Sequence, residues 1–259
     1  MSAPDGSPAG GLPSPGGGFE VRRAADRYLG GDPAAGVTTR HTFSFGEFYD
    51  PANTRFGLLL ACNEELLAAG AGFAEHTHRD TEIVTWVLAG ELEHRDADGT
   101  AVTLRPGDAQ LLSAGGGVRH VERNPGAEPL VFVQMWLHPD PFGGPPRHTV
   151  ARDPAGARGP AGPGLHPVAS GLPSVPAPLA LRQPHAALYL GRGAAELPAA
   201  PFRHVQAVRG RVAVGGRLLA PGDTLRVTGG GPLDAVPAEG ERGAPEYLVW
   251  EMHAEPSYG

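Results

Sequence analysis

Glycine and proline divide this chain into short apolar runs, and the length of those runs is what most restricts its fold. The chain has 39 Gly and 28 Pro in 259 residues. Most of the runs between them are about 4 to 9 residues long and rich in Val, Ile, Thr, Trp and Phe, which is typical of β-strands. In the first half the runs are 56–61, 82–95, 101–104, 108–113 and 129–137.

Two local patterns refine this prediction of strands. Asp98-Gly99 lies between two runs and predicts a hairpin, because Gly tolerates the positive φ of a tight primed turn. Residues 63–69, NEELLAA, are the one stretch that could form a helix, and an exposed loop with one turn fits them equally well.

The second half of the chain repeats features of the first. The turn at Gly90 and the Leu104–Asp108 segment recur at Gly210 and Leu219–Asp223, offset by 120 and 115 residues. A repeat of about 115 residues is a whole domain. Closing each sheet into a barrel removes the exposed edges that short, numerous strands would present. We therefore predict an all-β fold of two related barrels with few short helices.

Low-complexity composition marks the predicted boundaries. Residues 1–18 are mainly Pro, Gly, Ser and Ala with little to bury, which predicts a disordered tail. The same composition returns at 140–180, where the prolines argue against helix or central strand and predict a connection over the surface. The predicted division is a first barrel over 19–139 and a second over 181–259.

The residue counts exclude several kinds of chemistry. All 21 basic residues are Arg, so a lysine Schiff base and a P-loop lysine are both excluded. Cys62 is the single cysteine, so an intrachain disulfide, a four-cysteine zinc site and an iron–sulfur cluster are excluded too. Any metal must therefore be bound by carboxylates and by some of the 11 histidines.

Charge and hydropathy restrict the partners. The net charge of −7 repels nucleic-acid phosphate over most of the surface. The sequence has no apolar run long enough to span a membrane, and its N-terminus lacks the basic start and apolar stretch of a signal peptide. We predict a soluble cytoplasmic protein that contacts neither nucleic acid nor membrane.

Two pairs of alternating residues suggest a metal site. His76-x-His78 is followed 42 residues later by His120-x-Glu122. Alternate side chains of a strand share a face, so each pair points to one side. Two such pairs facing each other would supply three imidazoles and one carboxylate, which suits Fe(II), Mn, Ni, Cu or Zn with a position open for water or substrate. An isolated His-x-His pair on a strand is also a common surface feature.

The surrounding segments resemble the pirin family of two-domain cupins. The segments are RHTFSFGEFYDP at 40–51, GAGFAEHTHRDTEIVTWVLAGELEHRD at 70–96 and GDAQLLSAGGGVRHVERNP at 107–125. Dense matches cover about 40–137, and a weaker echo runs to the C-terminus. The resemblance implies two cupin-type, jelly-roll β-barrels arranged as a bicupin.

The same resemblance implies a cofactor and its ligands. It implies one divalent transition metal per chain in the first barrel, with iron the first choice and Cu, Mn, Ni, Co or Zn as alternatives. Its ligands would be His76, His78, His120 and Glu122. Glu82, at the position of the common cupin ligand, would not bind the metal. The chain departs from the family pattern at Thr77, where Pro is usual, and at the 115–117 glycine run.

The second barrel is predicted to lack this site. At the offsets of the repeat, Glu196, Pro198 and Ala235 occupy the positions of the three histidines. His204 and His253 are therefore predicted to be ordinary buried or surface histidines.

Side chains near the motifs have less definite roles. We expect His41 to order the N-terminal strand and His94 to be structural. Arg79 and Arg119 abut ligand histidines and could either orient them or be solvated. The 129–137 strand presents either Gln134 with Trp136 or Val133 with Met135 to the pocket.

The resemblance implies two alternative functions. The favoured prediction is a monomeric, metal-dependent dioxygenase that acts on a small aromatic or flavonoid-like substrate and opens the ring of a flavonol such as quercetin with O₂. In that reaction Glu122 would also act as general base. The alternative is a non-enzymatic, iron-binding redox-sensing regulator that contacts partner proteins. A purely structural metal is a third interpretation.

Overall fold

The computed structural model describes residues 18–156, 158 and 162–256, so the predicted tail, apart from Gly18, lies outside the described residues. Twenty-two strands and three 3₁₀ helices form this part of the chain. The first half contains η1 (Ala24–Asp26), β2 (Tyr28–Asp32), η2 (Pro33–Ala35), β3 (Val37–His41), η3 (Pro51–Asn53), β4 (Leu59–Leu67), β5 (Gly72–His78), β6 (Glu82–Ala89), β7 (Leu92–Asp96), β8 (Ala101–Leu104), β9 (Ala109–Ser113), β10 (Val118–Arg123), β11 (Leu130–Leu137) and β12 (Arg147–Ala151).

The remaining strands form the second half of the molecule. They are β1 (Phe19–Arg22), β13 (Gly164–Ser170), β14 (Leu179–Ala180), β15 (Ala186–Arg192), β16 (Ala195–Leu197), β17 (Phe202–Arg209), β18 (Val212–Val214), β19 (Arg217–Leu219), β20 (Thr224–Thr228), β21 (Leu233–Pro237) and β22 (Glu246–Met252). Each predicted strand run of the first half overlaps a strand, although the 56–61 run reaches only the first three residues of β4. The Asp98-Gly99 turn joins β7 to β8, with Gly99 at φ 89°.

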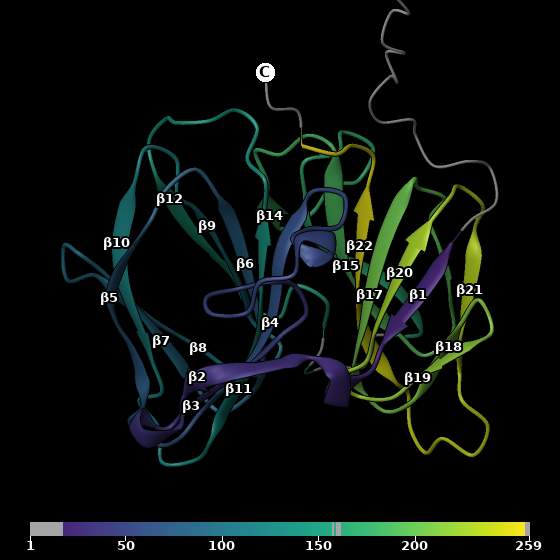
Figure 1. Cartoon of the computed structure of the whole chain (residues 1–259), viewed down its shortest axis with the longest axis horizontal. Helices are drawn as coiled ribbons and strands as arrows, with labels where there is room; N and C mark the ends of the chain where they lie inside the picture. The colour runs from purple at the N-terminus through teal and green to yellow at the C-terminus, as the bar shows by residue number, and fades with distance from the viewer. Residues whose placement is uncertain (1–17, 157, 159–161, 257–259) are drawn as a thin grey trace, which may run out of the picture.

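Each half consists of a seven-stranded and a four-stranded sheet. The first half has the orders β12-β9-β6-β11-β4-β3-β2 and β5-β10-β7-β8, and the second has β1-β20-β17-β22-β15-β13-β14 and β16-β21-β18-β19. The two halves lie side by side as two barrels (Figure 1). The predicted all-β bicupin is therefore confirmed. The five central strands of the large sheets and all four strands of the small sheets follow the same order in both halves. The edge strands differ, since β2 precedes β3 and pairs with it antiparallel, whereas β14 follows β13 and pairs with it parallel.

Two edge strands pair differently from what the predicted bounds of the first domain imply. β1 pairs with β20, so residues 19–22 belong to the sheet of the second barrel, where Figure 1 shows them in purple among green strands. β12 lies beyond residue 139 but pairs with β9 of the first barrel. Each of these strands occupies an edge of its large sheet. The other predicted domain bounds stay a prediction.

Two stretches differ from their local sequence pattern. Residues 63–67, within the stretch expected to be a helix or loop, continue β4, because pairing with β3 on one side and β11 on the other outweighs the helix propensity. The 140–180 tract contains β12, β13 and β14. β13 pairs with β15 and accommodates Pro167 beside a register shift between Pro167 and Ala169, where a missing N–H is tolerated.

The largest hydrophobic cluster joins the two large sheets. It includes Trp86 and Met135 from the first barrel and Leu188 and Trp250 from the second. The Trp250 indole N–H donates to the Met135 sulfur at 3.1 Å. Smaller clusters fill the interior of the second barrel and one end of the first. The first barrel therefore has a less completely apolar interior.

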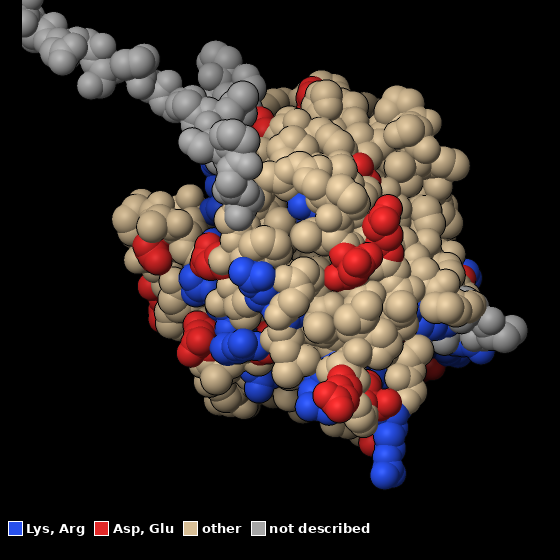
Figure 2. All heavy atoms as spheres, turned by 90° about the vertical axis from the view of Figure 1, so that its right-hand side faces the viewer, with Lys and Arg blue, Asp and Glu red and all other residues tan. Residues whose placement is uncertain are grey.

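The surface of the second barrel has mixed charge. On its outer face, arginine and carboxylate side chains are interspersed among neutral residues (Figure 2). In the part of the chain that the structure describes, no helix has the length and apolarity needed to cross a membrane.

Candidate metal centre

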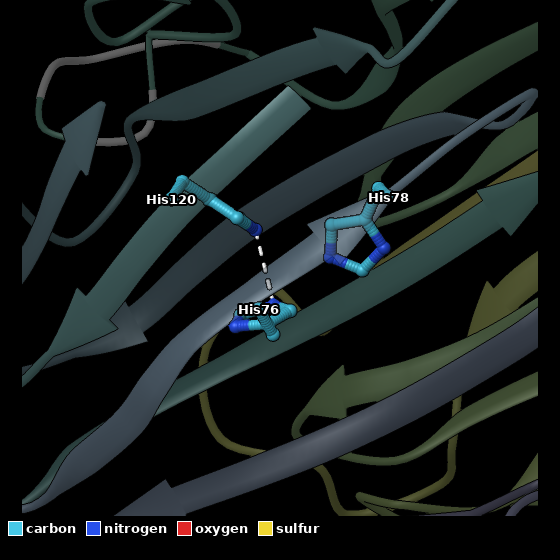
Figure 3. A group of neighbouring side chains, drawn as sticks. All are labelled: His76, His78 and His120. Carbon is cyan, nitrogen blue, oxygen red and sulfur yellow. Dashed lines mark hydrogen bonds between the residues drawn. The ribbon is translucent and has the colours of Figure 1, made fainter. Parts of the chain in front are cut away.

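The two alternating residue pairs meet on adjacent strands of the small sheet of the first barrel. β5 and β10 run antiparallel with His76 opposite His120 and His78 opposite Val118. A register shift between His120 and Glu122 lets the β10 strand bend at this point. The two pairs were expected to face each other but lie side by side on neighbouring strands. The three histidines lie on one face of these strands and point toward one another (Figure 3), while Glu122 groups with His94 and His120.

The imidazoles are close enough to share one ion. One ring nitrogen from each of the three lies within 4.8 Å of the others. The Nε2 atoms of His76 and His120 are 3.1 Å apart. The ring centroid of His78 lies 4.7 Å from that of His76 and 5.0 Å from that of His120. A divalent cation between these nitrogens would bring them to ordinary ligand distances of about 2 Å with small side-chain shifts.

The state of each nitrogen fits metal binding. The Nδ1 of His76 lies 2.9 Å from the carbonyl oxygen of Ala74, to which it can donate, so Nε2 keeps its lone pair. The Nε2 of His78 is buried and has no hydrogen-bond partner among the described residues. Burial is the main cause that lowers the pKa of His78 and of His120 to about 4, so both rings are neutral at pH 7. Neutral rings with unsatisfied nitrogens suit a cation.

Two glutamines hold the Glu122 carboxylate. The side-chain amide of Gln110 donates to Oε1 at 2.7 Å, and that of Gln134 donates to Oε2 at 2.9 Å. The amide oxygens are fixed in turn by the Nε2 of His148 at 3.0 Å and the indole N–H of Trp136 at 3.0 Å. Because a carboxylate has about four acceptor sites, lone pairs remain for a metal.

These contacts keep Glu122 ionised. Burial alone would raise the pKa of Glu122, but the nearby His94 and His120 and the Gln134 amide together lower it to about 2. The barrel interior therefore holds a fixed negative charge beside neutral imidazoles, an arrangement that attracts a cation.

His94 is closer to the site than a purely structural role requires. It is fully buried, with Nδ1 at 3.3 Å from Nδ1 of His120 and Nε2 at 3.2 Å from an oxygen of Asp96. If His120 donates from Nδ1, its Nε2 lone pair is free and His94 donates to Asp96. Burial lowers the pKa of His94, but Glu122 and Asp96 together raise it above its ordinary value. A raised pKa favours the protonated form of His94, and a cation bound nearby would displace that proton.

A cavity of about 970 Å³ adjoins the cluster. His76, His78 and Glu122 line it from the small sheet, and Gln134 and Trp136 line it from the large one. Val133 and Met135 pack instead in the cluster between the barrels. The Trp136 ring lies edge-on to His78, with centroids 4.9 Å apart. Gln134 and Trp136 are therefore the pocket pair of the two alternatives.

The other residues singled out in the sequence lie away from the cluster. Glu82 accepts a hydrogen bond from the Arg182 backbone N–H at 2.9 Å. Arg79 and Arg119 are exposed and pair with Asp80 and Glu75, so they are solvated arginines. The remaining histidines and Thr77 also have other settings. His41 contacts Asn63, His253 contacts Glu251, His204 packs against Phe43 and Thr77 is exposed on the other face of β5.

The strand register corrects two equivalences between the barrels. Ala195 lies opposite Ala235 in β16 and β21, as His76 lies opposite His120 in β5 and β10. Ala195, and not Glu196, is therefore the counterpart of His76, and Leu197, and not Pro198, is that of His78. The shift arises because the connection after β16 is one residue longer than the connection after β5.

A second polar group in the cavity was not apparent from the sequence. Glu65 is 4% exposed and lines the cavity with Thr39, His41 and Asn63. The Thr39 hydroxyl donates to its carboxylate at 2.5 Å. Burial raises the pKa of Glu65 to about 7, with Glu122 adding to this. Alternation along β4 could have indicated that Glu65 faces inward. Because Glu64 and Glu65 are adjacent, the sequence alone does not show which of them faces the cavity.

The fold and this cluster together define a bicupin with a histidine- and carboxylate-lined cavity in one barrel. The model of the Pirin family matches residues 19–137. The Escherichia coli pirin YhhW, solved in complex with nickel(II), has a TM-score of 0.78 and 29% identity, covering 91% of this chain and 99% of that one.

Curated relatives agree with this result. A Mycobacterium tuberculosis protein named a putative quercetin 2,3-dioxygenase is 42% identical over 243 residues, covering 91% of this chain and 96% of its own length. The Escherichia coli quercetin 2,3-dioxygenase is 42% identical over 113 residues, 43% of this chain and 49% of that protein. The chain belongs to the pirin family.

Proposed function

We propose that this protein is a metal-dependent dioxygenase that opens the ring of a flavonol with O₂. One divalent transition metal would be held by His76, His78, His120 and Glu122. The main observation in support is the buried, unpartnered Nε2 of His78, which converges with the imidazoles of His76 and His120 at the edge of a large cavity. The names of the relatives, quercetin 2,3-dioxygenases, supply the substrate class.

The same side chains offer a second donor set, in which His94 joins His120 and Glu122. Both nitrogens of His94 already face partners, one toward His120 and one toward Asp96. The unpartnered nitrogen belongs to His78. This difference favours His78 as the ligand and His94 as the residue that orients His120.

Three nitrogens and one carboxylate oxygen fit several metals. The set suits Fe(II), which is our first choice, and also Ni, Mn, Co, Cu and Zn. YhhW with its bound nickel(II) is a relative with a metal. When bound, the metal would lower the pKa of a substrate hydroxyl and hold the substrate beside O₂.

The protein side chains would bind and orient the substrate. Trp136 and Phe45 meet edge to face, with centroids 5.2 Å apart, and give the cavity an aromatic wall for a planar ring system. Glu122 is ionised and could accept the proton of the substrate hydroxyl. A pKa of about 2 makes it a weak base, so we assign it the ligand role first and the general-base role second.

The test combines metal content with oxygen uptake. Protein prepared without added metal should contain about one transition metal per chain and consume O₂ with quercetin. His76→Ala should lose both, while His253→Ala, on the second barrel, should keep both. A flat oxygen trace with iron, copper, manganese and nickel in turn would contradict the enzyme and favour the alternative, an iron-binding redox-sensing regulator that contacts partner proteins. The monomeric state and cytoplasmic location stay predictions.

A further inference from the structure

The cavity of the first barrel has polar groups on two sides, and the metal cluster accounts for one. The cluster lies on β5 and β10 of the small sheet, whereas Thr39, His41, Asn63 and Glu65 line the cavity from β3 and β4 of the large sheet. Phe45, Phe48, Phe73 and Trp136 are the aromatic residues of the lining. A molecule in this cavity would therefore meet polar groups on both sides and aromatic rings between them.

The polar residues on β3 and β4 converge on Glu65. Thr39 lies opposite Glu65, and His41 lies opposite Asn63. The Thr39 hydroxyl donates to Oε2 of Glu65, and the Nδ1 of His41 lies 3.1 Å from the Asn63 side-chain oxygen, which orients the Asn63 amide. Asn63 lies two residues from Glu65 on the same face of β4, and its amide favours the ionised form of Glu65 by lowering the pKa. The Thr39 hydroxyl thus holds the carboxylate, which keeps acceptor sites for further groups.

Glu65 is costly to the fold unless it binds something. It is 4% exposed and forms no ion pair with any residue that the structure describes. A buried carboxylate without a cationic partner lowers stability, and such groups are concentrated at binding sites. In the second barrel the equivalent position is Gly191, over which the ring of Tyr247 packs.

The size of the cavity bears on the size of its ligand. Gln134, whose amide holds Glu122, lies opposite Asn63, with His41 on the next strand. Along the large sheet the backbone of Gln134 is about 10 Å from that of His41, two strand spacings away, and about 8 Å from that of Glu65, one strand and two residues away. These separations and the cavity volume of about 970 Å³ leave room for more than one aromatic ring.

We propose that Glu65, oriented by Thr39, accepts hydrogen bonds from hydroxyl groups on the ring of the substrate that is remote from the metal. The substrate class is then a polycyclic phenol with hydroxyls at both ends, not a single-ring catechol. This inference rests on the proposed function, because it takes the metal side of the cavity as the other anchor. Glu65 is a specificity-determining residue in this scheme.

The test uses two flavonols that differ only at the remote ring: quercetin, with two hydroxyls there, and galangin, with none. Their dissociation constants are measured by calorimetry on nickel-loaded protein without O₂, so that binding is seen apart from turnover. Wild-type protein should bind quercetin more tightly. Glu65→Gln should weaken quercetin binding roughly 10- to 100-fold, the loss of hydrogen bonds to a charged group, and leave galangin binding unchanged.

Two further variants keep the test decisive. Thr39→Val removes only the donor to Glu65 and should weaken quercetin binding by a smaller factor, which serves if Glu65→Gln fails to fold. Glu64→Gln changes the neighbouring carboxylate, which pairs with Arg27 and Arg40, and should leave both constants unchanged. The inference would be overturned, and the proposed function left intact, by equal affinity of wild-type protein for the two flavonols or by an equal loss of affinity for both in Glu65→Gln. No binding of either flavonol by wild-type protein would overturn the proposed function with it.

Discussion

The two barrels share the order of their central strands but differ in what fills them. Across the large sheet of the first barrel, one row of inward side chains is polar. The row consists of His41, Asn63, Gln134, Thr85 and Gln110. The same row in the second barrel consists of Pro167, Tyr189, Val249, Val205 and Leu225. Four of these five residues pack in the hydrophobic cluster of that barrel.

The small sheets differ in the same way. Ala195 and Ala235 stand where the first barrel has His76 and His120. Val212 and Val214 similarly replace His94 and Asp96. Since the apolar version forms the same barrel, the fold does not require the histidine cluster. The polar residues of the first barrel are therefore best explained by what they bind.

The largest difference between the barrels should be metal content. We expect His76→Ala to reduce the metal from about one per chain to none, because two histidines and a carboxylate bind too weakly to survive dialysis against a chelator. The variant should stay folded, as the apolar second barrel implies, but lose the stabilisation that bound metal adds. Elemental analysis and thermal melting measure the two effects. Two metals per wild-type chain would break the comparison, since the second barrel would then have a site.

Glu122 tests how much the charge in the first barrel contributes. Glu122→Gln keeps the shape and one oxygen donor, so three histidines should retain some metal. If Glu122 is also the general base, turnover at metal saturation should fall about 10²- to 10⁴-fold, and raising the pH should partly restore it. Steady-state oxygen uptake across pH measures this. Near wild-type turnover in the metal-saturated variant would leave Glu122 as a ligand only.

Gln134 can be replaced by its counterpart in the second barrel. Gln134→Val, which copies Val249, removes the amide that holds Oε2 of Glu122 and frees the Trp136 indole. We expect metal affinity to weaken about 10- to 100-fold, the usual effect of losing a group that orients a ligand. Competition with a chelator of known affinity measures the change. Unchanged affinity would show that Gln110 alone is enough to orient the carboxylate.

The sequence predicted the fold and the shared face of His76 and His78, for a physical reason. Strand length and turn residues are local properties, and alternation along a strand determines which side chains share a face. The His76 and His78 pair and the Asp98-Gly99 turn are of this kind. Their placement in the structure follows from spacing alone, without knowledge of which strands are neighbours.

What the sequence did not predict depends on contacts between strands. Gln110 on β9 donates to Glu122 on β10, and His148 on β12 contacts Gln110. No spacing along the chain indicates these contacts. Glu65 lay in a stretch that could have been helix or loop, because pairing with β3 and β11 determines its strand state. The edge strands β1 and β12 pair with strands outside the segments predicted for them, and this pairing is also a contact between strands.

The Glu65 carboxyl should make the stability of the first barrel depend on pH in a way that the second barrel, with Gly191 at that position, does not share. Its pKa is raised to about 7 in the folded chain, mainly by burial, so the folded state holds a proton that the unfolded state releases near pH 4.5. The contribution of Glu65 to the free energy of unfolding should therefore fall as pH rises from about 4.5 to 7, by at most about 3 kcal/mol.

The measurement is a comparison of metal-free wild-type and Glu65→Gln proteins by chemical denaturation between pH 5 and 8. The histidines at the site, with pKa values lowered to about 4 in His78, His120 and His148, make stability rise with pH up to about 6.5 in both proteins. The difference between the two profiles isolates Glu65, because Gln does not ionise. That difference should favour the variant increasingly up to about pH 7 and then level off toward pH 8. Parallel profiles would mean that Glu65 is ionised throughout this range, and that the first barrel tolerates the buried charge without the cost inferred from its environment.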